Sequence, residues 1–301
     1  MMRATLGQGI TLPTLSADGR RLLARGLAGI GFAYGLWAIV ALGVAGEGGS
    51  TGTDALAYWT AGQAMLGGGS PYGAAPGEAG AYLYAPIFVQ VVAPLTLLPA
   101  AVFVWGWRLL EVVCLRVAVG SWTGAGVAIL VFPPVVIELA FANVNLIVAA
   151  VCALVMRGGV AVSGIPVVVK GVGLPLVPLA FLNGRAGFVR SLALLLAIVA
   201  VSVALAPSLW REYLELLSRT AQPTWWTNLS GDLPLAVRLA VGLGLGLVAI
   251  RFVRLAPIAV FVAQPIVWLS SLSILVAVVA PVARSPLARG GRPRPMAEAA
   301  P

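Results

Sequence analysis

The sequence predicts an all-α, polytopic integral membrane protein, a bundle of about eight to ten transmembrane helices. Of its 301 residues, 60% are hydrophobic and 10% are charged, and the mean hydropathy is +1.00. Soluble domains contain about 25% charged residues, so this chain lacks the charge that would cover a water-soluble globule. Several apolar runs also approach the ~20 residues that cross a bilayer core. These observations exclude a soluble α/β enzyme, a secreted disulfide scaffold and a disordered chain.

The basic residues mark the ends of the apolar runs. The net charge is +9, and Lys170 is the only lysine, so all other basic residues are arginines. Most of these arginines flank apolar runs, which indicates interface anchoring and topology, and no nucleic-acid partner is expected. Arg20, Arg21 and Arg25 precede the run 27–44. The positive-inside rule therefore predicts a retained first helix whose N-terminus faces the cytoplasm.

Two longer polar stretches interrupt the apolar runs. Residues 46–81 contain no Lys or Arg, and residues 207–233 form a second polar loop that is rich in aromatic and charged residues. Both loops are predicted to lie on the outer face. One transmembrane domain is expected over residues 1–283, with a disordered basic tail over 284–301. The later apolar runs cover 101–119, 124–139, 144–156, 160–182, 189–206, 235–250 and 255–282.

The last of these runs is interrupted by Gln264-Pro265, so it predicts either one span or two short helices. Because the two readings place the chain end on opposite sides of the membrane, the side of the C-terminus stays open.

The composition also limits the chemistry. The sequence contains no His, which excludes His-based acid–base catalysis, Ser-His-Asp triads and His-ligated metals. Cys114 and Cys152 lie in apolar runs and are expected to be small buried hydrophobes. No acidic cluster in the sequence marks a metal cage. Asp54 with one other acid of the outer loops would bind a divalent cation weakly, and no other cofactor is expected.

Asp54 is the first candidate for chemistry, in the stretch Gly52-Thr-Asp54-Ala-Leu-Ala-Tyr58-Trp59. A carboxylate at the mouth of a membrane cavity could accept a proton from a sugar hydroxyl as a general base. The same residue could instead be the N-cap of a helix. The aromatic residues around it, including Tyr72 and Tyr84, could form an interfacial belt or stack against sugar faces or a prenyl chain.

Charged residues inside the apolar runs form a second group of candidates. Lys170 could pair with a buried carboxylate such as Glu138 or Glu111, or it could bind a phosphate as a point charge. Arg108 and Glu111 stand three residues apart and could pair with each other on one helix. Each charge therefore has a structural and a functional interpretation.

Three asparagines form a third group. Asn143 and Asn145 fall between two apolar runs, where their amides could bond across helices or form a turn. Asn228 lies in an aromatic and polar cluster of the second outer loop.

An ordered series of motifs resembles glycosyltransferase family 87, the DUF2029 group of GT-C membrane enzymes, which includes polyprenyl-phosphate-mannose-dependent α-mannosyltransferases. The first block joins an acid, a Gly/Pro-Tyr loop and a proline-marked helix. It reads Asp54-x-x-x-Tyr58-x-x-Ala61-Gly62-x-Ala64-x-Leu66-x-Gly68-Gly69-x-Pro71-Tyr72, then Tyr84-x-Pro86 and Pro94-Leu-x-Leu-Leu-Pro99.

Four later blocks are also similar to the family's motifs, and Ser270 and Ser271 stand where its members usually place His. The series runs from Asp54 to Trp268. The later blocks are Asn143-Val-Asn145-Leu-Ile, Lys170-x-x-x-x-Pro175, Asn228-Leu-Ser230 and Gln264-Pro265-Ile-Val-Trp268.

The resemblance implies a GT-C-like fold in a multi-pass cell-membrane hexosyltransferase with an extracytoplasmic active site. The donor would be a polyprenyl-phosphate sugar, mannose or a related one, and the acceptor a glycolipid or glycan. Asp54 would be the catalytic base, and Lys170 with Arg108 would bind the donor phosphate. Sugar and lipid contacts are expected from Tyr58, Tyr72, Tyr84, Asn143, Asn145 and Asn228.

Two other classes of protein remain open. A polytopic transporter or lipid flippase would use Lys170, Glu138 and Glu111 as a path through the membrane. A degenerate, non-catalytic GT-C member would bind lipid or scaffold an envelope complex. Membrane lipids are expected partners in every case.

Overall fold

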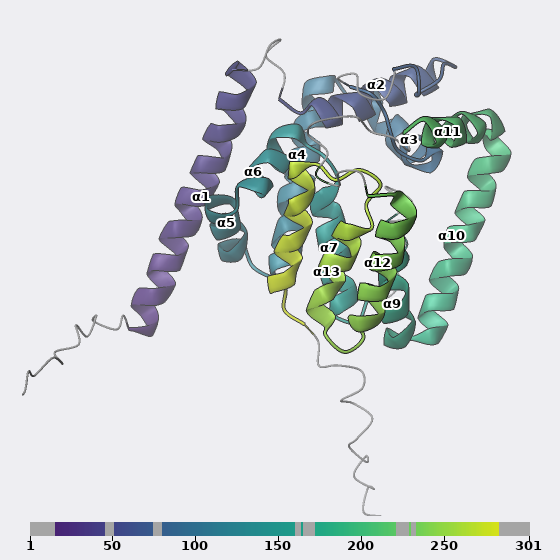
Figure 1. The fold of residues 1–301 in the computed structure, drawn as a ribbon. Coiled ribbons are helices and arrows are strands. Elements are labelled where there is room, and N and C mark those ends of the chain that lie inside the picture. Colours follow the sequence, from purple (N-terminus) through teal and green to yellow (C-terminus); the bar gives the residue numbers. More distant parts are fainter. Residues whose placement is uncertain are drawn as a thin grey trace, which may run out of the picture.

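The computed structural model describes residues 16–45, 51–74, 80–159, 164, 172–220, 229 and 233–282. Regular structure in these residues is entirely helical, which confirms the predicted all-α membrane protein. Figure 1 shows a central bundle between two long helices, α1 (Ala17–Ala45) and α10 (Arg185–Leu205). Further helices lie across one end of this bundle.

Within the described part of the chain, α1 and α10 are long and apolar enough to cross a membrane. The consecutive helices α4 (Ala100–Val119) and α5 (Trp122–Val131) meet the same criterion as a pair, with a bend of 104° between them. Shorter apolar helices of 10–17 residues, some of them counted with an adjoining 3₁₀ helix, are also found there. Helix length and composition thus support two or three spans, and the larger count stays a prediction.

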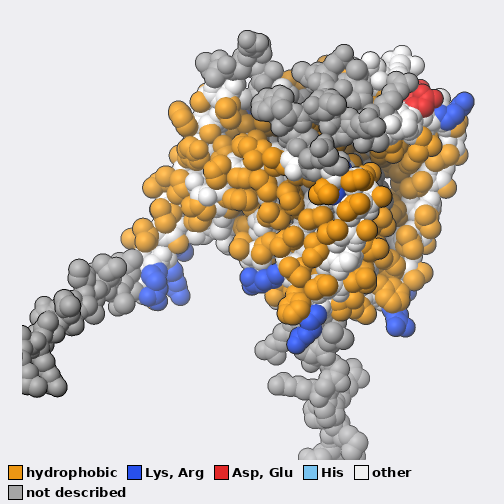
Figure 2. Space-filling model, in the orientation of Figure 1, with side chains coloured by type: hydrophobic (Ala, Val, Ile, Leu, Met, Phe, Trp, Pro, Cys, Tyr) orange, Lys and Arg blue, Asp and Glu red, His pale blue; other side chains and the backbone are white. Residues whose placement is uncertain are grey.

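Most exposed arginines gather at one end of the bundle, and exposed apolar side chains cover the body (Figure 2). The basic end is where α1 begins, where α9 (Val177–Asn183) meets α10, and where α12 (Leu235–Val248) meets α13 (Ala256–Val262). An apolar belt with a basic edge is typical of a membrane protein. The exposed arginines at these places are Arg20, Arg21, Arg25, Arg185, Arg251 and Arg254.

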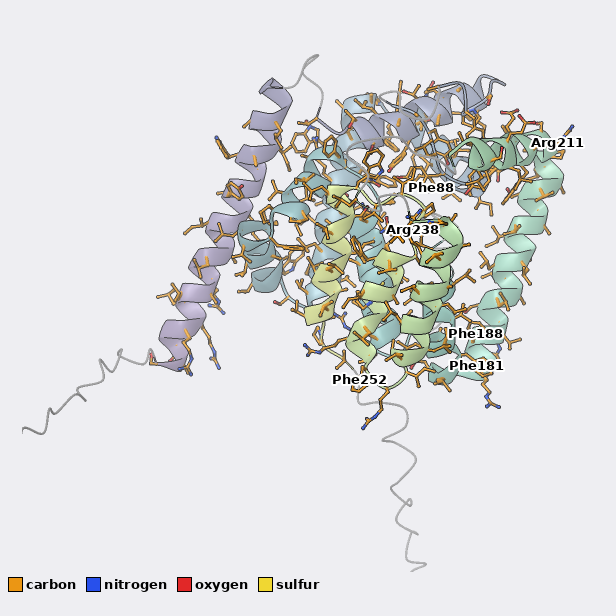
Figure 3. The ribbon with its side chains drawn as sticks, in the orientation of Figure 1. Phe88, Phe181, Phe188, Arg211, Arg238 and Phe252 are labelled. Carbon is orange, nitrogen blue, oxygen red and sulfur yellow. The ribbon has the colours of Figure 1, made fainter. Side chains whose placement is uncertain are left out.

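The opposite end of the bundle is covered by a layer of helices, on which Figure 3 labels Phe88 and Arg211. The layer contains α2 (Thr53–Leu66), α3 (Pro86–Val92), the 3₁₀ helix η1 (Ala93–Leu97) and α11 (Pro207–Thr220). The two predicted outer loops thus contribute to the same end of the molecule. That this end faces outward stays a prediction.

Each predicted loop contains a helix, α2 in the first and α11 in the second, so the prediction of a loop is wrong over these residues. In α11 the apolar residues Leu209 and Leu216 are buried, whereas Arg211 and Glu215 are exposed. Polar composition concealed this amphipathic spacing, which stabilises a helix lying on the end of the bundle.

The centre of the bundle is packed from short helices. These are α4, α6 (Pro133–Phe141), α7 (Asn145–Met156), α12, α13 and the 3₁₀ helix η4 (Leu269–Val279). Their buried side chains form a continuous apolar core that includes Leu115, Leu139, Leu146 and Ile274. Two smaller 3₁₀ helices, η2 (Leu174–Leu176) and η3 (Val253–Leu255), precede α9 and α13.

Prolines divide two of the predicted runs. The run 124–139 is interrupted at Phe132, where α5 ends and α6 begins with Pro133, because proline lacks the N–H that would continue the helix. The run 255–282 forms two short helices, α13 and η4, separated at Gln264-Pro265. The predicted division of this run is therefore present, and the side of the membrane on which the C-terminus lies stays a prediction.

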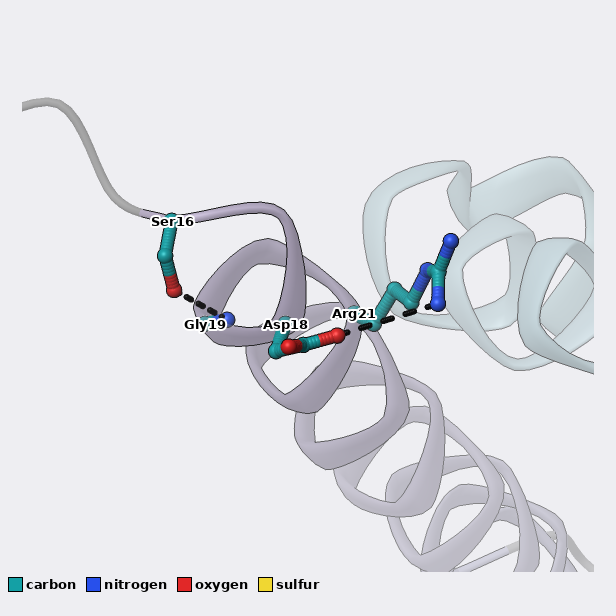
Figure 4. A network of polar contacts seen from close by, with 4 residues as sticks. All are labelled: Ser16, Asp18, Gly19 and Arg21. Carbon is teal, nitrogen blue, oxygen red and sulfur yellow. Dashed lines mark hydrogen bonds and ion pairs between the residues drawn. The ribbon is translucent and has the colours of Figure 1, made fainter.

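The helix α1 begins at Ala17, before the apolar run that predicted it. Ser16 Oγ accepts a hydrogen bond of 3.0 Å from the Gly19 N–H, which caps the first turn (Figure 4). Asp18 also forms an exposed ion pair with Arg21 at 3.7 Å. The cap extends the helix into the basic segment, whereas an exposed pair of this kind contributes little.

Glycines bring α1 close to α5. A Cβ built on Gly31 would lie 1.8 Å from the Gly126 carbonyl oxygen, and one on Gly126 would lie 2.4 Å from the Ala28 oxygen. The two backbones therefore approach at a distance that only glycine allows at these positions.

Candidate active site

Asp54 lies in the first turn of α2. The N-cap of this helix is Gly52, whose N–H donates to the Ala140 oxygen at 2.7 Å, so the prediction that Asp54 is the N-cap is wrong. Gly52 has a φ of 87°, and a Cβ there would lie 2.5 Å from Val104 Cγ1. The chain can reach the helix start in this way only with glycine. Asp54 is partly exposed, and the amino-terminal end of the helix dipole favours its negative charge.

Asn143 holds the Asp54 carboxylate. The Asn143 Nδ2 donates to Asp54 Oδ2 at 2.6 Å. The Asn143 Oδ1 accepts from the Tyr84 hydroxyl at 2.8 Å and from the Val144 N–H at 2.7 Å, and the Tyr58 hydroxyl lies 3.2 Å away. Because the Val144 N–H can only donate and the Asp54 carboxylate can only accept, the amide oxygen faces Val144 and the nitrogen faces Asp54. We call Asp54, Tyr58, Tyr84 and Asn143 the Asp54 cluster.

The turn between α6 and α7 places Asn143 beneath α2. Ala142 ends α6 in the left-handed conformation, with a φ of 56°, and Trp107 Nε1 donates to the Asn143 carbonyl oxygen at 2.7 Å. Asn145 points to Glu138, with its N–H 2.5 Å and its Nδ2 2.7 Å from the two carboxylate oxygens. Asn145 therefore stabilises the turn, and its predicted contact with sugar or lipid stays a prediction.

Aromatic rings enclose the cluster on the side of α3 and α4. The Tyr58 ring meets the rings of Tyr84, Phe88 and Trp107 nearly edge-on, with centroids 5.1, 5.1 and 5.3 Å away. Burial raises the pKa of the Tyr58 and Tyr84 hydroxyls well above the usual range, and the nearby Asp54 carboxylate raises both further. Both hydroxyls are therefore neutral hydrogen-bond donors at physiological pH.

Tyr72 joins the cluster from the segment that follows α2. Its hydroxyl donates to the Tyr84 carbonyl oxygen at 2.9 Å, and its N–H donates to Ser70 Oγ at 3.1 Å. Its ring lies 5.6 Å from that of Tyr82 and is partly exposed. Tyr72 thus lines the outer side of the cluster.

Arg108 is tied to the end of α6. Its Nε donates to the Leu139 oxygen at 3.1 Å and its Nη2 to the Ala140 oxygen at 3.3 Å, while the guanidinium lies 4.6 Å from the centroid of the Trp105 ring. The last carbonyls of a helix lack intrahelical partners and attract a cation. This buried arginine therefore stabilises the turn that presents Asn143, and its binding to phosphate stays a prediction.

The remaining candidates are Lys170, Asn228 and Glu111. Lys170 and Asn228 fall outside the described residues. Glu111 is fully buried, and neither carboxylate oxygen has a hydrogen-bond partner in the described structure, so the expected pair with Arg108 is absent there. The described residues also contain no group of three or more His, Cys, Asp or Glu placed to hold a metal ion.

Sequence reasoning missed Gly52 and Trp107. Gly52 sets the start of α2, and Trp107 fixes the backbone of Asn143. Trp107 stands in an apolar run, where nothing distinguishes it from a lipid-facing aromatic. Gly52 lies two positions before Asp54, but its importance depends on a positive φ that the sequence does not reveal.

Comparison with known proteins identifies the family. No curated protein and no solved structure matches this chain significantly. The profile of glycosyltransferase family 87 matches residues 82–300, which are most of the chain. The matched range includes Tyr84, Arg108 and Asn143 and begins after Asp54 and Tyr72. On this match, the chain belongs to glycosyltransferase family 87.

Proposed function

We propose that this membrane glycosyltransferase moves a sugar, mannose or a related one, from a polyprenyl-phosphate donor to a glycolipid or glycan acceptor. Asp54 is the general base of this reaction. The observation that carries the proposal is the 2.6 Å hydrogen bond from Asn143 to a partly exposed Asp54, with the amide oxygen held by the Val144 N–H and the Tyr84 hydroxyl. A general base needs this combination of fixed geometry and access to substrate.

The reaction assigns a role to each group. Asp54 takes the proton of the acceptor hydroxyl, whose oxygen attacks the anomeric carbon of the donor sugar. The bond from that carbon to the phosphate oxygen breaks, and its electron pair leaves with polyprenyl phosphate. The Asn143 amide keeps the carboxylate ionised and oriented. Lys170, with Arg108 behind the cluster, neutralises the charge that develops on the leaving phosphate.

A groove beside the cluster supports a donor with a long hydrocarbon chain. It lies between α3 and α10, has a volume of about 310 Å³ and is mainly apolar. On α3, Phe88 packs against Tyr58 and Tyr84 of the cluster, so one short helix separates groove and cluster. We assign the groove to part of the polyprenyl chain. Its lining residues are Ile87, Gln90, Val91, Ala197, Ile198, Val201, Ser202 and Leu205.

The distribution of arginines supports an extracytoplasmic reaction. Most exposed arginines gather at the end of the bundle opposite the α2 layer, and Arg211 on α11 lies at the α2 end (Figures 2 and 3). Since basic residues favour the cytoplasmic side, the Asp54 cluster would face outward.

The test is Asp54→Asn in purified, reconstituted protein supplied with a radiolabelled polyprenyl-phosphate sugar. The variant keeps the size of the side chain and loses its basicity, so sugar transfer should fall by about 10²–10⁴-fold. Binding of the donor lipid should persist. Asp18→Asn, at the far end of α1, is the control and should transfer normally. Unchanged transfer by Asp54→Asn would exclude the catalytic role.

A further inference from the structure

A polar and aromatic patch lies where α11 meets the segment that follows α2. The Ser70 hydroxyl donates to the Glu212 carboxylate, and the rings of Tyr72 and Tyr213 lie 6.1 Å apart at 31°. Ser70 is exposed, and the other three residues are partly exposed. We call these four residues the outer patch.

The outer patch is held in a fixed position relative to Asp54. The Tyr72 hydroxyl donates to the Tyr84 carbonyl oxygen at 2.9 Å, and the Tyr84 hydroxyl donates to Asn143 Oδ1 at 2.8 Å. Asn143 in turn donates to Asp54 at 2.6 Å. Three hydrogen bonds therefore connect the patch with the carboxylate.

We infer that the outer patch binds the acceptor as a neutral saccharide, an inference that rests on the proposed function. Aromatic rings can stack on the apolar C–H faces of a sugar, and the Glu212 carboxylate with the Ser70 hydroxyl can bond its hydroxyls. Such sites combine aromatic walls with a few placed polar groups.

The negative charge of the outer patch favours binding of the acceptor over binding of the donor. Glu212 would repel the phosphate of a polyprenyl-phosphate sugar, since like charges at short range are unfavourable. A neutral saccharide meets no such repulsion. The patch therefore suits the acceptor.

The helix α1 contains an exposed aromatic pair that lacks the polar groups of the outer patch. Tyr34 and Trp37 have centroids 6.1 Å apart at 29°, close to the geometry of Tyr72 and Tyr213. They lie in a membrane-spanning candidate helix among exposed apolar residues. This pair is a matched control, because it has similar ring geometry on a lipid-facing helix.

The experiment titrates a panel of neutral di- and trisaccharides into the full-length reconstituted protein by isothermal calorimetry. Tyr213→Ala and Glu212→Gln should each weaken saccharide binding about three- to tenfold. Tyr213→Phe keeps the ring and should bind normally, as should Tyr34→Ala. Binding of polyprenyl phosphate should stay unchanged in all four variants.

Three outcomes would overturn the inference. One is the absence of saturable saccharide binding by the unchanged protein. The second is an equal loss in Tyr34→Ala, and the third is a parallel loss of polyprenyl phosphate binding in the Tyr213 and Glu212 variants. Asp54→Asn separates the two proposals, because it should still bind saccharide saturably while losing transfer. If it transfers normally as well, the catalytic proposal fails and the saccharide site stands.

Discussion

Asn143 controls the state of the Asp54 carboxylate through one short contact. Its nitrogen lies 2.6 Å from Asp54 Oδ2, and its oxygen accepts from Tyr84 and Val144. A neutral amide at this distance stabilises the ionised form of the carboxylate, whereas a second carboxylate would oppose it. Replacing the Asn143 amide with a carboxylate takes a single substitution, Asn143→Asp.

Asn143→Asp should move the acidic limb of the pH–rate profile to higher pH. The new negative charge beside Asp54 raises the pKa of the carboxyl pair, and a base works only when it is deprotonated, so activity appears at a higher pH than in the unchanged protein. The measurement is sugar transfer as a function of pH. Asn183→Asp is the control, because Asn183 donates to the Val155 oxygen at 2.7 Å, away from the cluster. An unmoved limb in Asn143→Asp would contradict the assigned contact.

The sequence predicted which residues belong to the site better than it predicted the hydrogen bonds that they make. Asp54, Tyr58, Tyr84 and Asn143 were candidates from residue type and motif, and the structure brings all four together. The sequence could not show that Asn145, two positions from Asn143, points to Glu138 instead. That difference depends on the left-handed turn at Ala142, a conformation that alanine rarely adopts.

At the scale of helices, the glycines of α1 and α5 set how closely two helices pack. A Cβ on Gly126 would lie 2.4 Å from the Ala28 oxygen, whereas one on Gly106 in α4 would meet nothing within 4 Å. The same chemical change can therefore be tested in a crowded and in an open helix position.

Gly126→Ala should destabilise the protein by about 1–3 kcal/mol, because α1 must move away from α5. Gly106→Ala should be neutral or stabilising by up to about 1 kcal/mol, because alanine favours the helix. Thermal unfolding in detergent, followed by tryptophan fluorescence, compares the two. Equal melting temperatures would mean that the close approach of α1 and α5 does not limit stability.

Helices could be predicted where they coincide with a long apolar run. They were predicted less well where only the spacing of apolar residues along an otherwise polar segment indicates a helix. The run 101–119 matches α4 closely, because it is long and uninterrupted. The helix α11 was expected as a loop, since its charged residues lower the mean hydropathy even though Leu209 and Leu216 share a buried face. Pro133 could have divided the run 124–139, because proline is known to end helices.

For the whole molecule, the arrangement of charge predicts which end faces the cytoplasm. The arginines near the start of α1 and near Arg251 lie at one end, and Arg211 on α11 lies at the other (Figure 3). Both Arg211 and Arg251 are exposed and can be replaced by a cysteine for labelling.

Arg211→Cys should react with a membrane-impermeant thiol reagent in intact cells, and Arg251→Cys should react only after permeabilisation. The expectation follows from the positive-inside rule. The natural Cys114 and Cys152 are replaced by alanine beforehand, so that only the introduced thiol reports. The reverse pattern would place the Asp54 cluster on the cytoplasmic side and contradict the proposed reaction site.

The membrane class could be predicted from the whole sequence, but the number of spans could not. A shortage of charge is a property of the entire chain and survives any error in a single helix boundary. Counting spans requires each boundary, and the central helices are short and broken by prolines. Lys170, the strongest intramembrane candidate, lies outside the described residues and keeps its predicted role.

Tyr84 connects the outer patch with the Asp54 cluster. Its backbone oxygen accepts a hydrogen bond from Tyr72, and its hydroxyl donates one to Asn143. A saccharide that keeps Tyr72 in place would therefore also favour the orientation of Asp54, and by thermodynamic reciprocity an oriented Asp54 would favour the saccharide. Without an acceptor, Tyr72 and Asp54 do not stabilise each other's positions in this way, and a water molecule is too small to contact both. An enzyme built in this way would spare its activated donor from hydrolysis until an acceptor has arrived.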